Sequence, residues 1–127
     1  MSGRHILIVD DNAMNVEMVS YILETADFTV ASAMDAMAAK AMIPAFQPDL
    51  ILMDIQMPGM DGLALTRELK GDPGTSHIAI VAFTAYAMKG DEARMRASGC
   101  DGYISKPINI ATFASEVQAA LSPSPLA

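Results

Sequence analysis

Short apolar runs alternate along this chain with segments of helical periodicity. The runs cover residues 5–9, 28–31, 50–53, 78–83 and 103–104. The first, third and fourth are nearly unbroken and rich in Ile, Leu and Val, which is typical of parallel strands buried on both faces. The second and fifth are weaker, and we expect them nearer the edges of a sheet.

Two longer helices are predicted from apolar residues that recur every three or four positions. One covers residues 16–26, with Asp11 or Asn12 available as its N-cap, and the other covers 110–121, with Asn109 as the expected cap.

Three further helical segments are shorter or weaker. We expect a helix over 63–69 that ends at Gly71, and one over 36–43 that ends at Pro44 because proline interrupts helices. The weakest pattern lies at 87–97.

This alternation of strands and helices predicts an α/β fold, a doubly wound five-stranded parallel sheet with helices on both faces. Right-handed crossovers leave few arrangements, and the commonest is the strand order 2-1-3-4-5. The chain then reverses between strands 1 and 3, and ligands bind beyond the carboxyl ends of the strands at such a reversal.

Composition and length fit one compact domain. The chain has 127 residues, of which 52% are hydrophobic and 18% charged, which is too apolar for a disordered protein. We place the domain at residues 1–121 and a proline-rich flexible tail at 122–127. The apolar runs are far shorter than the ~20 residues that span a bilayer, and the N-terminus lacks the features of a signal peptide. We therefore expect a cytoplasmic protein.

The charge balance argues against nucleic acid or a membrane surface as a partner. Lys and Arg number 8 and Asp and Glu 15, which gives a net charge of −7. No basic cluster of the kind that binds phosphate backbones is present in the sequence.

Five polar residues fall at the carboxyl ends of the predicted strands. Asp10 and Asp11 follow the first strand, Asp54 the third and Thr84 the fourth, and Lys106 comes after the fifth. Each acid taken alone has a simpler interpretation, as the N-cap of the helix that follows. Together, the five residues predict a common site at one edge of the sheet.

The chemistry of this set points to a metal-assisted phosphoryl site. Three neighbouring carboxylates repel one another, and a divalent cation relieves that repulsion. Ligands that are all oxygen favour a hard ion such as Mg²⁺. A metal, the Lys106 ammonium and the Thr84 hydroxyl around a free carboxylate could stabilise a phosphoryl group in transfer. An aspartate can itself be the acceptor.

The stretches ILIVDDNAMN, DLILMDIQMPGMDG, VAFTA and YISKPI resemble, in order and spacing, the receiver domains of two-component response regulators. The resemblance covers residues 4–121 and implies the flavodoxin-like (βα)5 fold. MDIQMPGMDG, TAYAMKGDE and SKPI look closest to the small cell-division receivers of the DivK type.

The resemblance implies a role for each matching position. Asp54 would be the phosphoacceptor, and Asp11 would bind Mg²⁺ directly, with Asp10 binding it directly or through water. The backbone carbonyl of Gln56 would be a further ligand. Thr84 and Lys106 would contact the phosphoryl oxygens, and Tyr103 would be the aromatic switch residue.

The sequence therefore predicts a stand-alone receiver, a phosphoacceptor switch rather than an enzyme, apart from slow self-dephosphorylation. A histidine kinase or phosphotransfer protein would supply the phosphoryl group, and the expected pathway is cell-cycle or cell-division control. A downstream protein would bind the face formed by 78–83, 103–104 and 110–121, or the group would pass onward in a phosphorelay. Alternatives are an aspartyl-phosphate phosphohydrolase and a non-phosphorylated pseudo-receiver that acts as a binding module.

The histidines, the cysteine and several methionines are expected to have structural rather than functional roles. His5 and His77 lie at the amino ends of strands, away from the acids, and Cys100 is expected to be a small packed residue. Met14, Met18, Met37, Met42 and Met53 are expected to fill gaps in the core, with an adaptable partner surface as the alternative.

Overall fold

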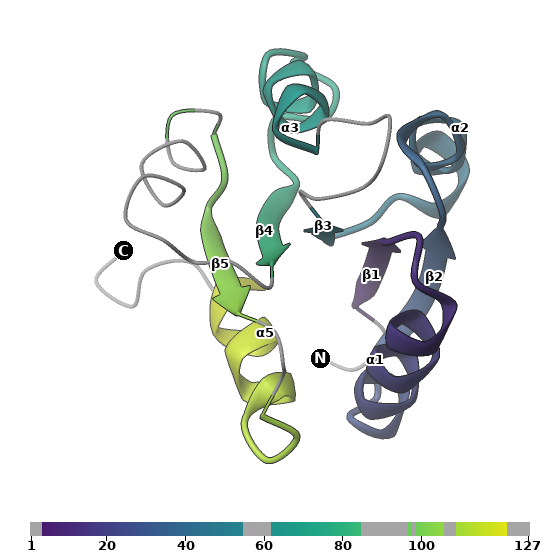
Figure 1. Ribbon diagram of the computed structural model, residues 1–127. Coiled ribbons are helices and arrows are strands. Elements are labelled where there is room, and N and C mark those ends of the chain that lie inside the picture. The colour runs from purple at the N-terminus through teal and green to yellow at the C-terminus, as the bar shows by residue number, and fades with distance from the viewer. Residues whose placement is uncertain (1–3, 55–61, 85–96, 98, 106–108, 122–127) are drawn as a thin grey trace.

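The computed structural model describes residues 4–54, 62–84, 97, 99–105 and 109–121. The helices and strands along these residues are shown in Figure 1. In chain order they are β1 (His5–Val9), α1 (Ala13–Thr25), β2 (Thr29–Ala33), α2 (Ala36–Phe46), β3 (Leu50–Asp54), α3 (Gly62–Lys70), β4 (Ala79–Thr84), β5 (Gly102–Ser105) and α5 (Phe113–Leu121). Apart from Ala97, the helix predicted at 87–97 lies outside the described residues.

The strands form one five-stranded sheet in the order β2-β1-β3-β4-β5, and every neighbouring pair is parallel. The predicted fold class and strand order are confirmed. The two weaker apolar runs form the strands β2 and β5 at the two edges of the sheet, each paired with a strand on one side only within the described residues. The uninterrupted runs form the central strands, because a central strand in a covered parallel sheet is buried on both faces.

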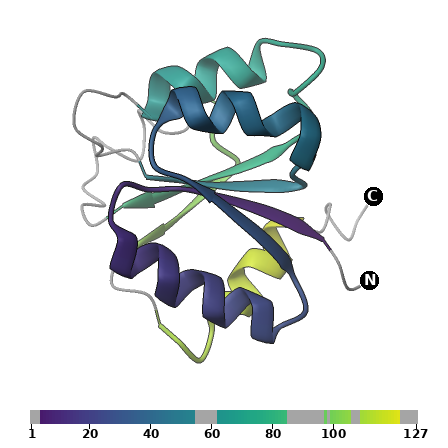
Figure 2. The same ribbon diagram turned by 90° about the vertical axis from the view of Figure 1, so that its right-hand side faces the viewer.

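Helices cover both faces of the sheet, as Figure 2 shows with the sheet seen nearly edge-on. Successive side chains of a strand point to opposite faces, so β1 and β3 each contribute to two apolar layers. One layer holds Leu7, Val9, Ile51 and Met53 and packs against α2 and α3. The other holds Ile6, Ile8, Leu50 and Leu52 and packs against α1 and α5.

Pro44 lies inside α2 and does not end it, so the boundary predicted there is wrong. Proline removes one helical hydrogen bond, yet the helix continues for two residues beyond it and ends at Phe46. The backbone N–H of Gln47 donates to the Ile43 carbonyl at 2.8 Å, and Gln47 takes the left-handed conformation with φ 52° that commonly closes helices. The Phe46 ring stacks on His5 with 4.8 Å between ring centroids, so packing favours the extra turn.

Two other boundaries differ from the prediction. The strand expected at 28–31 runs over Thr29–Ala33, and Phe28 packs into the core just before it. The last helix begins at Phe113, and Ile110 is 67% exposed. The Asn109 side chain caps a turn ahead of the helix, accepting a hydrogen bond from the N–H of Ala111 at 3.0 Å. No helix in the described ranges is long and apolar enough to cross a membrane.

Candidate functional site

Three carboxylates meet at the reversal point of the sheet. Asp10 directly follows β1, Asp11 is next to it, and Asp54 is the last residue of β3, which pairs with β1. One carboxylate oxygen from each residue lies within 4.8 Å of the others. Asp10 is 1% exposed and Asp54 is 4% exposed, whereas Asp11 is exposed to solvent. The structure thus brings together the three acids that the sequence places at this edge.

Local hydrogen bonds fix the turn that carries Asp10 and Asp11. The Asp10 backbone N–H donates to the carbonyl of Ala33 at 3.1 Å, which extends the pairing of β1 with β2 by one residue. The Asp10 carboxylate accepts from the N–H of Asn12 at 2.9 Å. Asn12 in turn caps α1, because its side-chain oxygen accepts from the N–H of Asn15 at 3.1 Å. The interpretation of Asp11 as a helix cap is therefore wrong.

The arrangement of charge favours a cation. Asp10 and Asp54 are almost fully buried, and Asp11 adds a third carboxylate at the rim. Like charges at this separation repel, and burial makes the repulsion larger because water screens it less. A bound divalent ion would offset it, and the oxygen-only donor set fits Mg²⁺, which commonly binds one or two carboxylates and keeps several waters.

The remaining predicted site residues are only partly described. Thr84 is the last residue of β4 and directly follows Phe83, which pairs with Asp54 across the sheet. Tyr103 lies in β5 opposite Ala82 and is 38% exposed. Gln56 and Lys106 lie outside the described residues.

An open hollow beside the acids was not predicted from the sequence. Its volume is about 520 Å³, and it extends from Asp10 between α1 and β2. The residues that line it are Asp10, Ala13, Val16, Glu17, Ser20, Tyr21, Glu24, Ser32 and Met34. Its lining is therefore both acidic and apolar, and it shares Asp10 with the cluster of three acids.

The α1 surface next to this hollow is unusually apolar. Met14, Met18 and Tyr21 are all exposed, with Met14 at 80%. The core interpretation is wrong for Met14, Met18 and Met37 and correct for Met53, which is fully buried. The signal was present in the sequence, because Met14, Met18 and Tyr21 share one helix face that differs from the buried face with Val19 and Leu23.

The histidines and the cysteine lie away from the acids. His5 begins β1 at the opposite end of the strand, where its Nδ1 lies 2.7 Å from the Phe46 carbonyl oxygen. His77 is exposed and precedes β4. Cys100 is half-buried and packs against the apolar layer under α2 and α3, which confirms its packing role.

A doubly wound parallel sheet with three acids at its reversal point defines a class of proteins that bind ligands at this edge. Within that class, the chain belongs to the response regulator receiver family, since the model of the response regulator receiver domain matches residues 6–118. The family expected from the sequence is confirmed.

Curated relatives and solved structures agree with this assignment. The chain is 39% identical over 118 residues to the polar-differentiation response regulator DivK of Brucella anthropi, covering 93% of this chain and 96% of the relative. The DivK proteins of Brucella ovis and Brucella abortus show the same identity and coverage. The expected similarity to DivK is therefore confirmed.

Two solved structures are informative about fold and site. The chemotaxis protein CheY4 of Vibrio cholerae superposes with a TM-score of 0.88 at 26% identity, covering 94% of this chain and 99% of that one. The receiver domain of a sensor histidine kinase from Pseudomonas aeruginosa PAO1 has a TM-score of 0.84 at 29% identity, covering 94% of this chain and 98% of its own. That structure holds a magnesium ion coordinated in its active-site cleft.

Proposed function

We propose that this protein is a stand-alone response regulator that accepts a phosphoryl group on Asp54 in the presence of Mg²⁺. The observation that carries the proposal is the approach of the Asp10, Asp11 and Asp54 oxygens to within 4.8 Å at the reversal point of the sheet. We place the domain that accepts the phosphoryl group at residues 1–121.

Mg²⁺ would be held by Asp10, Asp11 and Asp54, together with the backbone carbonyl of Gln56. When bound, the ion supplies positive charge that lowers the repulsion between the carboxylates and an incoming phosphoryl group. The oxygen donors in this structure fit that ion, and a related receiver structure contains it.

Asp54 is the acceptor, and its neighbours have different tasks. Its carboxylate oxygen forms the new bond to phosphorus while the phosphorus–nitrogen bond of a donor phosphohistidine breaks, and the departing imidazole takes up a proton. Asp10 is held by the N–H of Asn12, which favours a fixed ligand over a nucleophile. Thr84, at the end of the neighbouring strand, and Lys106 contact the phosphoryl oxygens.

The donor is a histidine kinase or a histidine phosphotransfer protein. The exposed Met14, Met18 and Tyr21 on α1 support a protein contact beside the acids, because apolar patches of this kind on soluble domains mark interaction sites. Glu17 and Glu24 line the adjacent hollow and favour a donor surface that carries basic residues.

The output is a change in protein binding at the face formed by β4, β5 and α5, where Tyr103 is partly exposed. Similarity to the polar-differentiation response regulator DivK supports a role in cell-cycle or cell-division control, and we place the protein in the cytoplasm. The protein acts as a switch and not as an enzyme. A phosphohydrolase is disfavoured because such enzymes use a second acid two residues after the nucleophile, and Gln56 occupies that position.

The proposal is tested by intact mass after incubation with phosphoramidate and Mg²⁺. We expect one phosphoryl adduct on the wild type, none without Mg²⁺ and none on Asp54→Asn. Asp35→Asn is the matched control, because Asp35 caps α2 and asparagine caps helices equally well. No adduct on the wild type, under conditions that label another receiver, would instead favour a non-phosphorylated binding module.

A further inference from the structure

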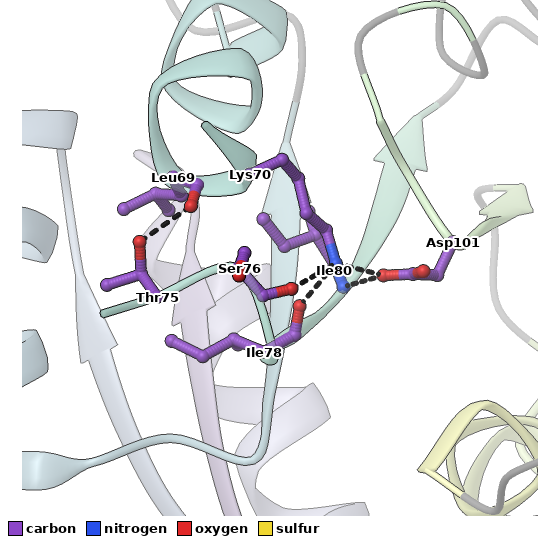
Figure 3. Close-up of polar contacts among 7 residues, drawn as sticks. All are labelled: Leu69, Lys70, Thr75, Ser76, Ile78, Ile80 and Asp101. Atoms are coloured by element: carbon purple, nitrogen blue, oxygen red, sulfur yellow. Dashed lines mark hydrogen bonds and ion pairs between the residues drawn. The ribbon is translucent and has the colours of Figure 1, made fainter. Parts of the chain in front are cut away.

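Lys70, the last residue of α3, connects three separate segments of the chain. Its ammonium donates to the backbone carbonyls of Ile78 at 2.7 Å and Ser76 at 3.3 Å, and it forms an ion pair with Asp101 at 2.8 Å (Figure 3). The side chain is only 20% exposed. A lysine has three N–H donors, and these three acceptors match that number.

Asp101 directly precedes β5 and forms hydrogen bonds with β4. The carboxylate oxygen that meets Lys70 also accepts from the backbone N–H of Ile80 at 2.8 Å. The backbone N–H of Asp101 donates to the Ile80 carbonyl at 2.7 Å. β5 then begins at Gly102, which pairs with Val81. Asp101 therefore sets the register in which β5 joins the sheet.

The backbone before Asp101 is fitted to the stem of Lys70. Gly99 has φ +105°, and a Cβ built there would lie 2.9 Å from Cγ of Lys70. Only glycine adopts this conformation readily and leaves that space. The segment that precedes β5 therefore contacts Lys70 at two places. Gly99 lies against its aliphatic stem, and Asp101 pairs with its ammonium.

We infer that Lys70 and Asp101 are positioning residues for phosphorylation, an inference that rests on the proposed function. β5 has four residues and lies at the edge of the sheet, where β4 is the strand that pairs with it among the described residues. Its register aligns Ser105 with Thr84, one position beyond the pair of Phe83 and Ile104, and Phe83 also pairs with Asp54. Because Lys106 follows Ser105 in the sequence, a change in the register of β5 would also displace the start of the segment that carries this lysine.

Two substitutions remove the ion pair and keep the volume of the side chains. Lys70→Met keeps the stem against Gly99, and Asp101→Asn keeps an oxygen for the N–H of Ile80. Lys40→Met is the matched control. Lys40 forms an ion pair with Glu68 at 2.6 Å, and this pair joins α2 to α3 and does not involve the residue that precedes β5.

Three readouts separate positioning from a structural role: thermal unfolding, Mg²⁺ affinity by calorimetry, and the initial rate of phosphorylation by phosphoramidate at saturating Mg²⁺. We expect Lys70→Met and Asp101→Asn to bind Mg²⁺ within about twofold of the wild type, since the acids lie on β1 and β3. We expect their phosphorylation rates to fall about tenfold or more, because small misplacements of a reacting group have effects of this size. Lys40→Met keeps the wild-type rate.

Each outcome decides between the two proposals. If a variant is folded and binds Mg²⁺ but is phosphorylated at the wild-type rate, the positioning role is overturned. The proposal that Asp54 accepts the phosphoryl group is unaffected by that result. An unmodified wild type contradicts the proposed function, and the positioning role falls with it. If Lys70→Met does not fold, Asp101→Asn gives the answer, because it keeps both backbone contacts to Ile80.

Discussion

At the scale of single residues, the site places two buried carboxylates next to a third, exposed one. The buried Asp10 accepts a hydrogen bond from the N–H of Asn12. One carboxylate oxygen each from Asp10, Asp11 and the buried Asp54 lie close enough together to bind a single ion. Such a cluster is poised for a cation, because removing carboxylates from water is costly unless charge or hydrogen bonds compensate. Asp11 is exposed, so the cluster reaches the protein surface, where the proposed phosphoryl donor would approach it.

Gly99 gives a residue-scale prediction. Gly99→Ala adds a Cβ at a positive φ and at 2.9 Å from the Lys70 stem. We expect a loss of about 1–3 kcal/mol in the free energy of unfolding, measured by urea denaturation. Gly102→Ala is the control, since no atom lies within 4 Å of its added Cβ, and it should change stability by about 0.5 kcal/mol or less. Equal effects of the two substitutions would contradict the close fit.

At the scale of elements, strand ends and helix starts deliver the functional groups. β1 ends just before Asp10, and Asn12, two residues after Asp10, is the N-cap of α1. The cap lets the helix start at once, so Asp10 and Asp11 occupy a short, well-defined turn between a buried strand and a buried helix face.

The cap of α1 can be tested directly. Asn12→Ala removes the oxygen that accepts from the N–H of Asn15, and we expect it to lower the free energy of unfolding by about 1 kcal/mol. Asn12→Ser keeps an acceptor and should retain most of that stability. Chemical denaturation of both variants measures the difference, and an alanine variant as stable as the serine one would show that the cap contributes nothing.

The strands and their order were predictable because buried parallel strands leave unbroken apolar runs and right-handed crossovers restrict topology. The convergence of Asp10, Asp11 and Asp54 followed from the same reasoning. Continuation of α2 past Pro44 was not predictable, because it depends on tertiary packing of Phe46 against His5. The ion pair of Lys70 with Asp101 joins residues far apart in sequence, and nothing local indicates it.

For the whole molecule, binding of Mg²⁺ to the folded state adds to stability by mass action. At a concentration one hundred times the dissociation constant, we expect Mg²⁺ to stabilise the wild type by about 2.7 kcal/mol. Asp11→Asn should show about half of this effect or less, given at least tenfold weaker binding. Thermal unfolding with and without Mg²⁺ measures both.

Asp27→Asn is the control for that experiment. Asp27 lies in the turn after α1 with φ 72°, a conformation that asparagine also tolerates. It should respond to Mg²⁺ like the wild type. An equal Mg²⁺ response in Asp11→Asn would contradict the assignment of the metal site to the three acids.

The most direct test of the acceptor is to locate the phosphoryl group within the chain. The protein is labelled with phosphoramidate and Mg²⁺, the acyl phosphate is reduced with borohydride, and the modified residue is identified by peptide mass spectrometry. We predict modification at Asp54 alone, lost in Asp54→Asn and retained in Asp35→Asn. Modification at Asp10 or Asp11 in the wild type, or an unchanged labelling rate in Asp54→Asn, would contradict Asp54 as the phosphoacceptor.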